Sequence, residues 1–187
     1  MNVHVCDTSS NEGILALNNL TRIKAQHVIA FSAPMSNGVG VMVRKIMAEA
    51  EKSPTGTIKT LAIWAHGGPG SQGISRGRES AGNAHWAGID LETLASDQSM
   101  RETLGQLWQV TDWTGWVELR GCSVGAGVRG QQFLNILAAI WEVPVHAGEV
   151  DQAVTGVSGL ELAWTGTVHV ARPGVSGTTT FQGAIRR

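Results

Sequence analysis

The chain has 187 residues, with 14 Lys plus Arg, 15 Asp plus Glu and a formal net charge of −1. This length predicts a single domain over 1–187, with a core at about 26–170. A nucleic-acid partner is not expected, because the basic residues are scattered and such a surface needs clustered Lys and Arg. A membrane partner is not expected either, because the longest apolar runs are far shorter than a membrane span.

The two cysteines, Cys6 and Cys122, are too few for a disulfide framework. The first residues (MNVHVCDTSSNEG) lack a basic start followed by an apolar stretch, so no secretion signal is predicted. We therefore expect a cytoplasmic protein with reduced thiols, although signal-independent export is compatible with the same sequence. No cofactor is expected. No metal site is expected, since the histidines and cysteines lack close ligand spacing. The sequence does not predict the oligomeric state.

The first half of the chain predicts a strand–helix–strand unit. A short β-branched run at 27–31 predicts a strand, and apolar residues at helical spacing predict a helix over 38–52. The run at 58–65 predicts the next strand. Before this unit, 11–25 are weakly amphipathic and poorly capped. After it, 67–88 are rich in Gly, Ser and Asn, which favours a functional loop or a hairpin.

The second half predicts another unit of the same kind. A helix is expected over 90–108, in one or two pieces, followed by a strand at 116–119, a helix at 127–141 and a strand at 143–147. Alternating runs at 160–164, 167–171 and 178–181 then predict a terminal antiparallel hairpin. The expected fold is a three-layer α/β sandwich, with a mainly parallel central sheet, helices on both faces and a C-terminal antiparallel hairpin.

Two predicted strands end in residues that can do chemistry. The first runs into His66-Gly67, and the second into Gly121-Cys122. Because parallel strands present their carboxyl ends at one edge, a base and a nucleophile are expected there together. Cys122 also precedes a predicted helix, whose N-terminus would lower the pKa of the thiol. The plainer alternatives are a buried cysteine that only packs and a histidine that only satisfies a loop.

The order of these motifs resembles the caspase-like clan of cysteine peptidases, which includes caspases, gingipains, legumains and metacaspases. The likeness is closer to caspase-like domains of bacterial adhesins and to self-cleaving domains of bacterial toxins. It covers about 58–165 and is carried by 65–70 (AHGGPG), 119–124 (LRGCSV), 130–134 (GQQFL) and 143–147 (VPVHA).

The resemblance implies a cysteine endopeptidase that acts on a peptide or protein substrate, with self-processing as one form of that activity. Cys122 would be the nucleophile and His66 the acid–base partner. Backbone N–H groups at Gly67 and Cys122 would hold the oxyanion. The scattered Lys and Arg do not supply the basic patch with which the toxin domains bind an inositol polyphosphate.

The resemblance gives two opposite expectations for the substrate pocket. Arg120 stands two residues before Cys122, a position that often lines the first specificity pocket in this clan and would here favour an acidic substrate side chain. Glu149 and Asp151 follow the next predicted strand and would favour a basic side chain instead. A further alternative is that Arg120 forms an ordinary surface ion pair.

A second hydrolase plan fits the same residues. The HGGPG run also matches the oxyanion motif of proline-iminopeptidase-like α/β-hydrolases, and GCSVG at 121–125 matches a nucleophile elbow with Ser123 as nucleophile. Asp151 and His169 would then follow in triad order. Against this plan, the chain after Ser123 is short, and the segment around His169 alternates like a strand.

A third hypothesis is a catalytically inactive caspase-like domain that binds a partner. The predicted helix at 127–141, or Trp108, Trp113 and Trp116, could form the interaction face. Ordinary core packing is the alternative for these tryptophans.

Overall fold

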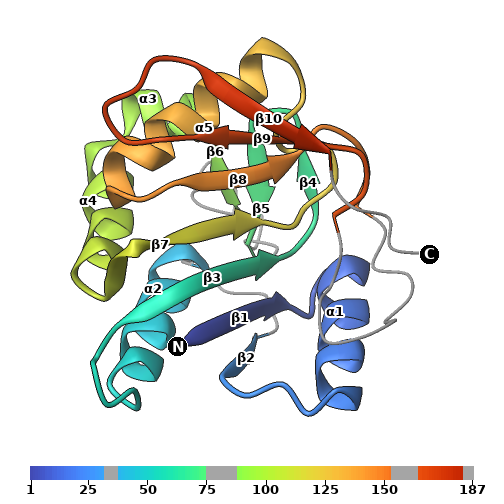
Figure 1. Cartoon of the computed structure of the whole chain (residues 1–187), viewed down its shortest axis with the longest axis vertical. Helices are drawn as coiled ribbons and strands as arrows, with labels where there is room; N and C mark the ends of the chain where they lie inside the picture. The colour runs from blue at the N-terminus through green and yellow to red at the C-terminus, as the bar shows by residue number, and fades with distance from the viewer. Residues whose placement is uncertain (32–37, 75–87, 153–163, 183–187) are drawn as a thin grey trace, which may run out of the picture.

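A computed structural model describes residues 1–31, 38–74, 88–152 and 164–182. Its centre is a seven-stranded sheet in the order β10-β9-β8-β7-β3-β1-β2 (Figure 1). In this sheet β2, β1, β3, β7 and β8 are parallel to one another, whereas β9 is antiparallel to β8 and β10 is antiparallel to β9. The strand bounds are β1 Asn2–Asp7, β2 Val28–Phe31, β3 Ile58–Trp64, β7 Thr111–Leu119, β8 Val145–Gly148, β9 Thr167–Ala171 and β10 Thr178–Gln182.

Side chains alternate between the two faces of this sheet, as the pleat requires. On one face, Val5, Ile63 and Leu119 belong to the larger apolar core, which also contains residues of the helices α2, α4 and α5. On the other face, Cys6 and Trp64 pack with α1 in a smaller cluster. The apolar residues on both faces give a three-layer arrangement around the strands.

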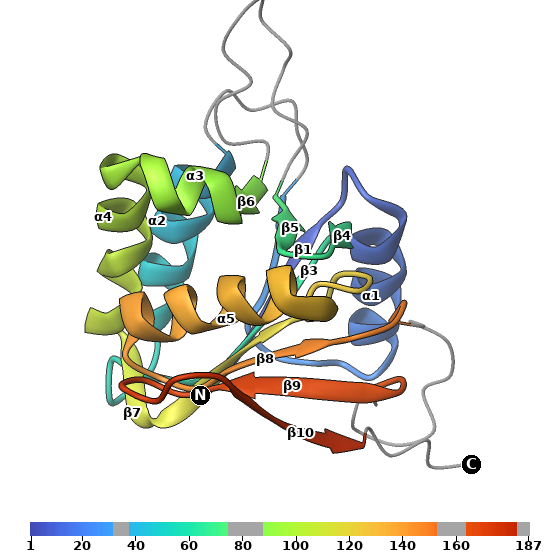
Figure 2. The same ribbon diagram turned by 90° about the horizontal axis from the view of Figure 1, so that it is seen from above.

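The helices are divided unequally between the faces. Helix α1 (Asn11–Arg22) stands apart from the group formed by α2 (Gly38–Ala50), α3 (Leu91–Ser96), α4 (Gln98–Gly105) and α5 (Gly127–Trp141), as Figure 2 shows. A short 3-10 turn, η1 (Gln106–Gln109), continues from α4. The side chain of Ser10 accepts a hydrogen bond from the Gly13 N–H and so begins α1 with a cap that the sequence pattern had not indicated.

The predicted fold class is confirmed: the protein is α/β, with a mostly parallel central sheet, helices and a C-terminal antiparallel strand pair. The helix predicted over 90–108 occurs as separate pieces, because Asp97 lies in an extended conformation between α3 and α4 and caps the second. The strand predicted at 160–164 lies largely outside the described residues. Strand β1 was not predicted from its alternating pattern, yet it pairs with both β2 and β3 in the interior of the sheet.

The glycine-rich region after β3 forms a small second sheet within the described residues. Strands β4 (Gly67–Gly68), β5 (Ser71–Gly73) and β6 (Gly88–Asp90) pair in antiparallel fashion. The antiparallel pairing agrees with the hairpin alternative in the described part of 67–88, whereas 75–87 lie outside the described residues. The small sheet lies directly after the strand that ends before His66. None of the helices in the described ranges is long and apolar enough to cross a membrane.

Candidate active site

The predicted base and nucleophile follow adjacent strands of the sheet. His66 comes two residues after β3 ends, Cys122 comes three residues after β7 ends, and β3 and β7 are hydrogen-bonded neighbours. The backbones after both strands are in contact, since a Cβ on Gly67 would lie 2.9 Å from the Gly121 Cα and 3.0 Å from the Cys122 nitrogen. Glycine at both positions therefore allows the two strand ends to meet.

Gln72 of β5 ties the same two strand ends together. Its side chain is fully buried. The Gly121 N–H donates to its Oε1 at 3.2 Å, and its Nε2 donates to the His66 carbonyl at 3.5 Å. The Gly73 N–H donates to the same carbonyl at 2.6 Å. The small sheet thus holds the backbone of His66 and fixes its position relative to the turn that carries Cys122.

Glu12 joins the two predicted catalytic side chains. Its Oε1 lies 3.2 Å from His66 Nδ1 and accepts a hydrogen bond from Cys122 Sγ at 3.9 Å. Because the same Glu12 oxygen makes both contacts, the distance between Cys122 Sγ and His66 Nδ1 cannot exceed the sum of these two distances. His66 and Cys122 therefore share one site, with the carboxylate of Glu12 between them.

The local structure at the end of β1 places Glu12. Ser10 Oγ donates to the Asp7 carbonyl at 3.0 Å and caps α1. Gly13 packs so closely on the Asp7 backbone that no side chain would fit at this position. These contacts hold the first turn of α1 against the end of β1, next to the end of β3. Glu12 is not among the residues that the sequence predicted for the site, although the alternating run of β1 followed by Ser10 could have indicated it.

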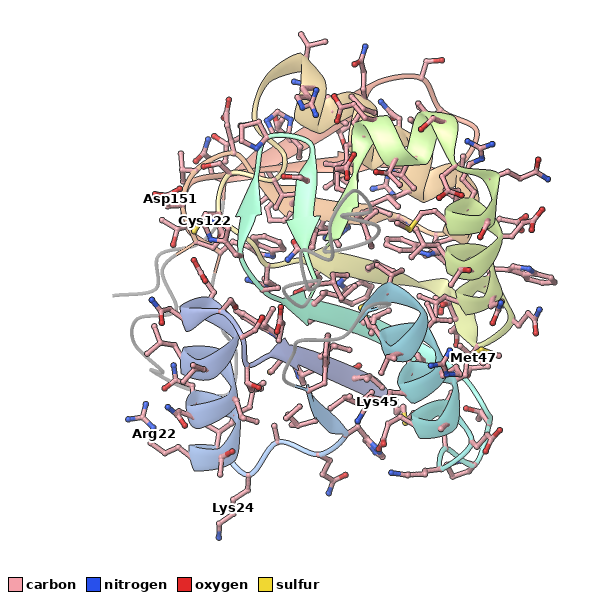
Figure 3. All side chains as sticks on the ribbon, turned by 180° about the vertical axis from the view of Figure 1, so that it is seen from behind. Arg22, Lys24, Lys45, Met47, Cys122 and Asp151 are labelled. Atoms are coloured by element: carbon pink, nitrogen blue, oxygen red, sulfur yellow. The ribbon has the colours of Figure 1, made fainter. Side chains whose placement is uncertain are left out.

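The electrostatic environment of Cys122 disfavours the thiolate. Partial burial raises the pKa of the thiol; the backbone N–H of Gln152 opposes this effect, and the charges of Asp151 and Glu12 add to it. The prediction that a helix N-terminus lowers this pKa is wrong. Helix α5 begins only at Gly127, so the sulfur lies in a turn beside two carboxylates. Cys122 and Asp151 lie side by side in Figure 3.

Arg120 lies in a buried ion pair. Its side chain pairs with Glu118 at 2.6 Å, and its guanidinium stacks 3.7 Å from the centre of the Trp164 ring and 5.1 Å from that of Trp64. Burial works against ionisation of Glu118, but Arg120 and a hydrogen bond from Trp116 hold its pKa below the ordinary value. The expected contact with an acidic substrate needs a free guanidinium, and here that group is already neutralised by a carboxylate.

The residues of the alternative serine plan are only partly brought together. Ser123 has a positive φ of 55°, and its Oγ donates directly to Asp151 Oδ1 at 2.9 Å. His169, by contrast, is buried in β9, where Nδ1 contacts Thr178 Oγ1 at 3.3 Å and Nε2 lies 3.8 Å from Glu149. A triad needs a histidine between serine and aspartate, and His169 is engaged elsewhere. Glu149 and Asp151 are both exposed after β8.

The tryptophans of the binding hypothesis differ in exposure. Trp113 is 86% exposed and Trp108 is 54% exposed. Trp116 instead stacks on His146, and its Nε1 donates to Glu118 at 2.8 Å. Two exposed tryptophans near the start of β7 are therefore compatible with a contact surface, far along the sheet from Cys122.

No protein-family model, curated protein or solved structure matches this chain. Its candidate function therefore depends on the geometry of its own residues. Among the residues that the structure describes, no group of three or more His, Cys, Asp or Glu side chains is arranged so that it could hold a metal ion.

Proposed function

We propose that the protein is a cysteine endopeptidase of the caspase-like kind, with Cys122 as nucleophile and His66 as acid–base partner. The observation that carries this proposal is the shared contact of both side chains with one oxygen of Glu12, at the ends of two adjacent parallel strands. The order of the strands also supports it. The chain passes from β1 to β2 on one side and then to β3 on the other, so β1 and β3 flank a topological switch point, where α/β proteins hold their ligands.

The proposed reaction uses groups that this site contains. The thiol proton of Cys122 passes to His66 as the sulfur attacks the substrate carbonyl carbon, and the carbonyl oxygen becomes an oxyanion. The C–N bond breaks, and His66 gives the proton to the leaving amine. Water, deprotonated by His66, then attacks the thioester. The C–S bond breaks, and the proton returns to the sulfur.

The backbone beside Gly67 suits an oxyanion. The Cys122 nitrogen faces a glycine, where any larger side chain would cover it. A backbone N–H aimed at a developing negative charge typically contributes a factor of about 10²–10³ to the rate. Gln72 holds Gly121, the residue before this N–H, so the donor is fixed before substrate arrives.

The test is cleavage of a peptide library by wild type and three variants. We expect Cys122→Ala and His66→Ala each to abolish cleavage, and Ser123→Ala to retain most of it. Loss with Ser123→Ala, together with survival of Cys122→Ala, would instead support the serine hydrolase. Absence of any cleavage by folded wild-type protein would support the binding module.

A further inference from the structure

We propose that Glu12 is a positioning residue of the His66–Cys122 pair: its carboxylate fixes the His66 ring through Nδ1 and accepts the thiol hydrogen of Cys122 in the resting protein. This inference rests on the proposed function for its catalytic meaning. The contacts from which it is drawn do not depend on that function, because they are made between side chains of this chain.

The exposure of His66 and Glu12 is the first argument. The His66 side chain is 75% exposed, so packing alone does not restrain its ring. Glu12 is only 20% exposed and stands on a capped helix whose first turn is held against β1. A restrained carboxylate that contacts an otherwise free ring selects one orientation of that ring.

The chemistry of the imidazole is the second argument. A carboxylate only accepts hydrogen bonds, so its contact with Nδ1 favours the ring proton on that nitrogen, and the proton that the reaction exchanges is then carried by Nε2. A carboxylate that holds a histidine in one tautomer contributes strongly to catalysis in other hydrolases, although it touches no substrate. Glu12 would do the same here, and its removal would leave His66 free to change tautomer and rotamer.

The contact of Glu12 with the sulfur makes ionisation of Cys122 less favourable, whereas its contact with the ring assists His66. A negative charge near Cys122 favours the protonated thiol, and Glu12 is one of two carboxylates that act on it, Asp151 being the other. Loss of Glu12 should therefore make Cys122 ionise more readily while it makes His66 a poorer partner. A residue with a merely structural role would not produce these two opposite changes.

The experiment compares Glu12→Gln and Glu12→Ala with wild type by iodoacetamide alkylation across pH and by peptide cleavage. Glu12→Gln removes the charge but keeps an acceptor for Nδ1–H, whereas Glu12→Ala removes both. We expect the alkylation profile of Cys122 to shift to lower pH in both variants, with a rate at neutral pH about fivefold higher, the factor for ~1 kcal/mol between unit charges 4 Å apart in water. We expect kcat/KM to fall at least about tenfold in Glu12→Ala, and less in Glu12→Gln.

Two controls separate these effects from unfolding. Glu51→Gln removes an exposed carboxylate beyond the end of α2, at the opposite end of the strands from the site. It should change neither the alkylation profile of Cys122 nor kcat/KM. Cys6 is fully buried and should stay unalkylated in every folded variant, so its labelling would report unfolding. The ¹⁵N shifts of the His66 ring give a readout without substrate: a single Nδ1–H tautomer is expected in wild type and a mixture in Glu12→Ala.

The outcomes distinguish the two proposals. Overlapping alkylation profiles of wild type and Glu12→Gln, or the same His66 tautomer in wild type and Glu12→Ala, would overturn the role of Glu12 whether or not peptides are cleaved. Shifted alkylation profiles without any cleavage by wild type would support the contacts of Glu12 and would overturn the proposed peptidase function. Equal cleavage by wild type and Glu12→Ala would also overturn the positioning role.

Discussion

Gly67 and Gly121 meet back to back, so that a Cβ added to either one would lie 2.9 Å from the Cα of the other. This contact brings the ends of β3 and β7 together and thereby sets the separation of His66 and Cys122. The candidate site depends on two residues that have no side chain, and its tolerance to substitution follows from that.

Gly67→Ala should therefore reduce both stability and cleavage. The new methyl group would lie 2.6 Å from Val124 Cγ2 and 2.9 Å from the Gly121 Cα, so the two strand ends must separate. Overpacking of this kind typically costs about 1–3 kcal/mol, to be measured by urea unfolding. Gly105→Ala is the matched control, since nothing lies within 4 Å of its added Cβ and alanine favours the helix. Equal stability and cleavage in the two variants would contradict the packing argument.

Gln72→Leu should weaken the same junction by a different route. Leucine has a similar size, but it can neither accept a hydrogen bond from the Gly121 N–H nor donate one to the His66 carbonyl. A buried group left without a partner costs roughly 1–3 kcal/mol, and the loosened His66 backbone should lower kcat more than it raises KM. Gln98→Leu on the exposed side of α4 is the control and should stay within about 0.5 kcal/mol of wild type. A wild-type kcat in Gln72→Leu would show that catalysis does not need the hydrogen bonds of Gln72 to Gly121 and His66.

Arg120→Ala should act on stability, because it leaves Glu118 buried without its partner. Removal of one member of a buried pair costs about 3–5 kcal/mol, and the double variant Glu118→Gln/Arg120→Met should lose less. Urea unfolding measures both, with the exposed Arg22→Ala as control. The pocket hypothesis makes a different prediction, namely that Arg120→Met stays stable and selectively loses substrates with an acidic side chain.

Asp151→Asn should shift the alkylation profile of Cys122 to lower pH. Asp151 is a carboxylate whose charge raises the pKa of this thiol, and asparagine keeps an oxygen that can accept from Ser123 Oγ. The shift should add to that of Glu12→Gln in the double variant if the two charges act independently. An unshifted profile in Asp151→Asn would mean that the charge of Asp151 does not act on this thiol.

Cys6 should make the protein less stable at high pH. Burial raises the pKa of its thiol to about 12 from an ordinary 9.0, so the folded state holds this proton more tightly than the unfolded state. The resulting stabilisation is fully present below about pH 9 and is lost as the pH rises toward 12. It amounts to roughly 4 kcal/mol at most, since one pKa unit corresponds to about 1.4 kcal/mol. Cys6→Ala should flatten the dependence of the unfolding free energy on pH between 9 and 12. An unchanged slope would show that the Cys6 thiol does not cause this dependence.

The local patterns of the sequence determined most of the elements. The apolar residues of 127–141 recur at helical spacing, and α5 has these bounds. The residues 61–65 that end before His66 are apolar throughout, as is typical of a strand buried on both faces, and this part of β3 is buried. The parallel sheet could also be predicted, because strands that alternate with helices along the chain usually pair in parallel.

The sequence alone determined that a histidine and a cysteine follow two buried strands, because that depends on spacing within each segment. Only the tertiary structure decided what surrounds them. Glu12 lies 54 residues before His66 in the chain and reaches the pair because β1, which precedes it, pairs with β3. Arg120, which pairs with Glu118 two residues before it, is covered by the ring of Trp164 from a distant part of the chain. Contacts of this kind arise from strand order and burial, and these are set by the free energy of the whole fold rather than by any local pattern.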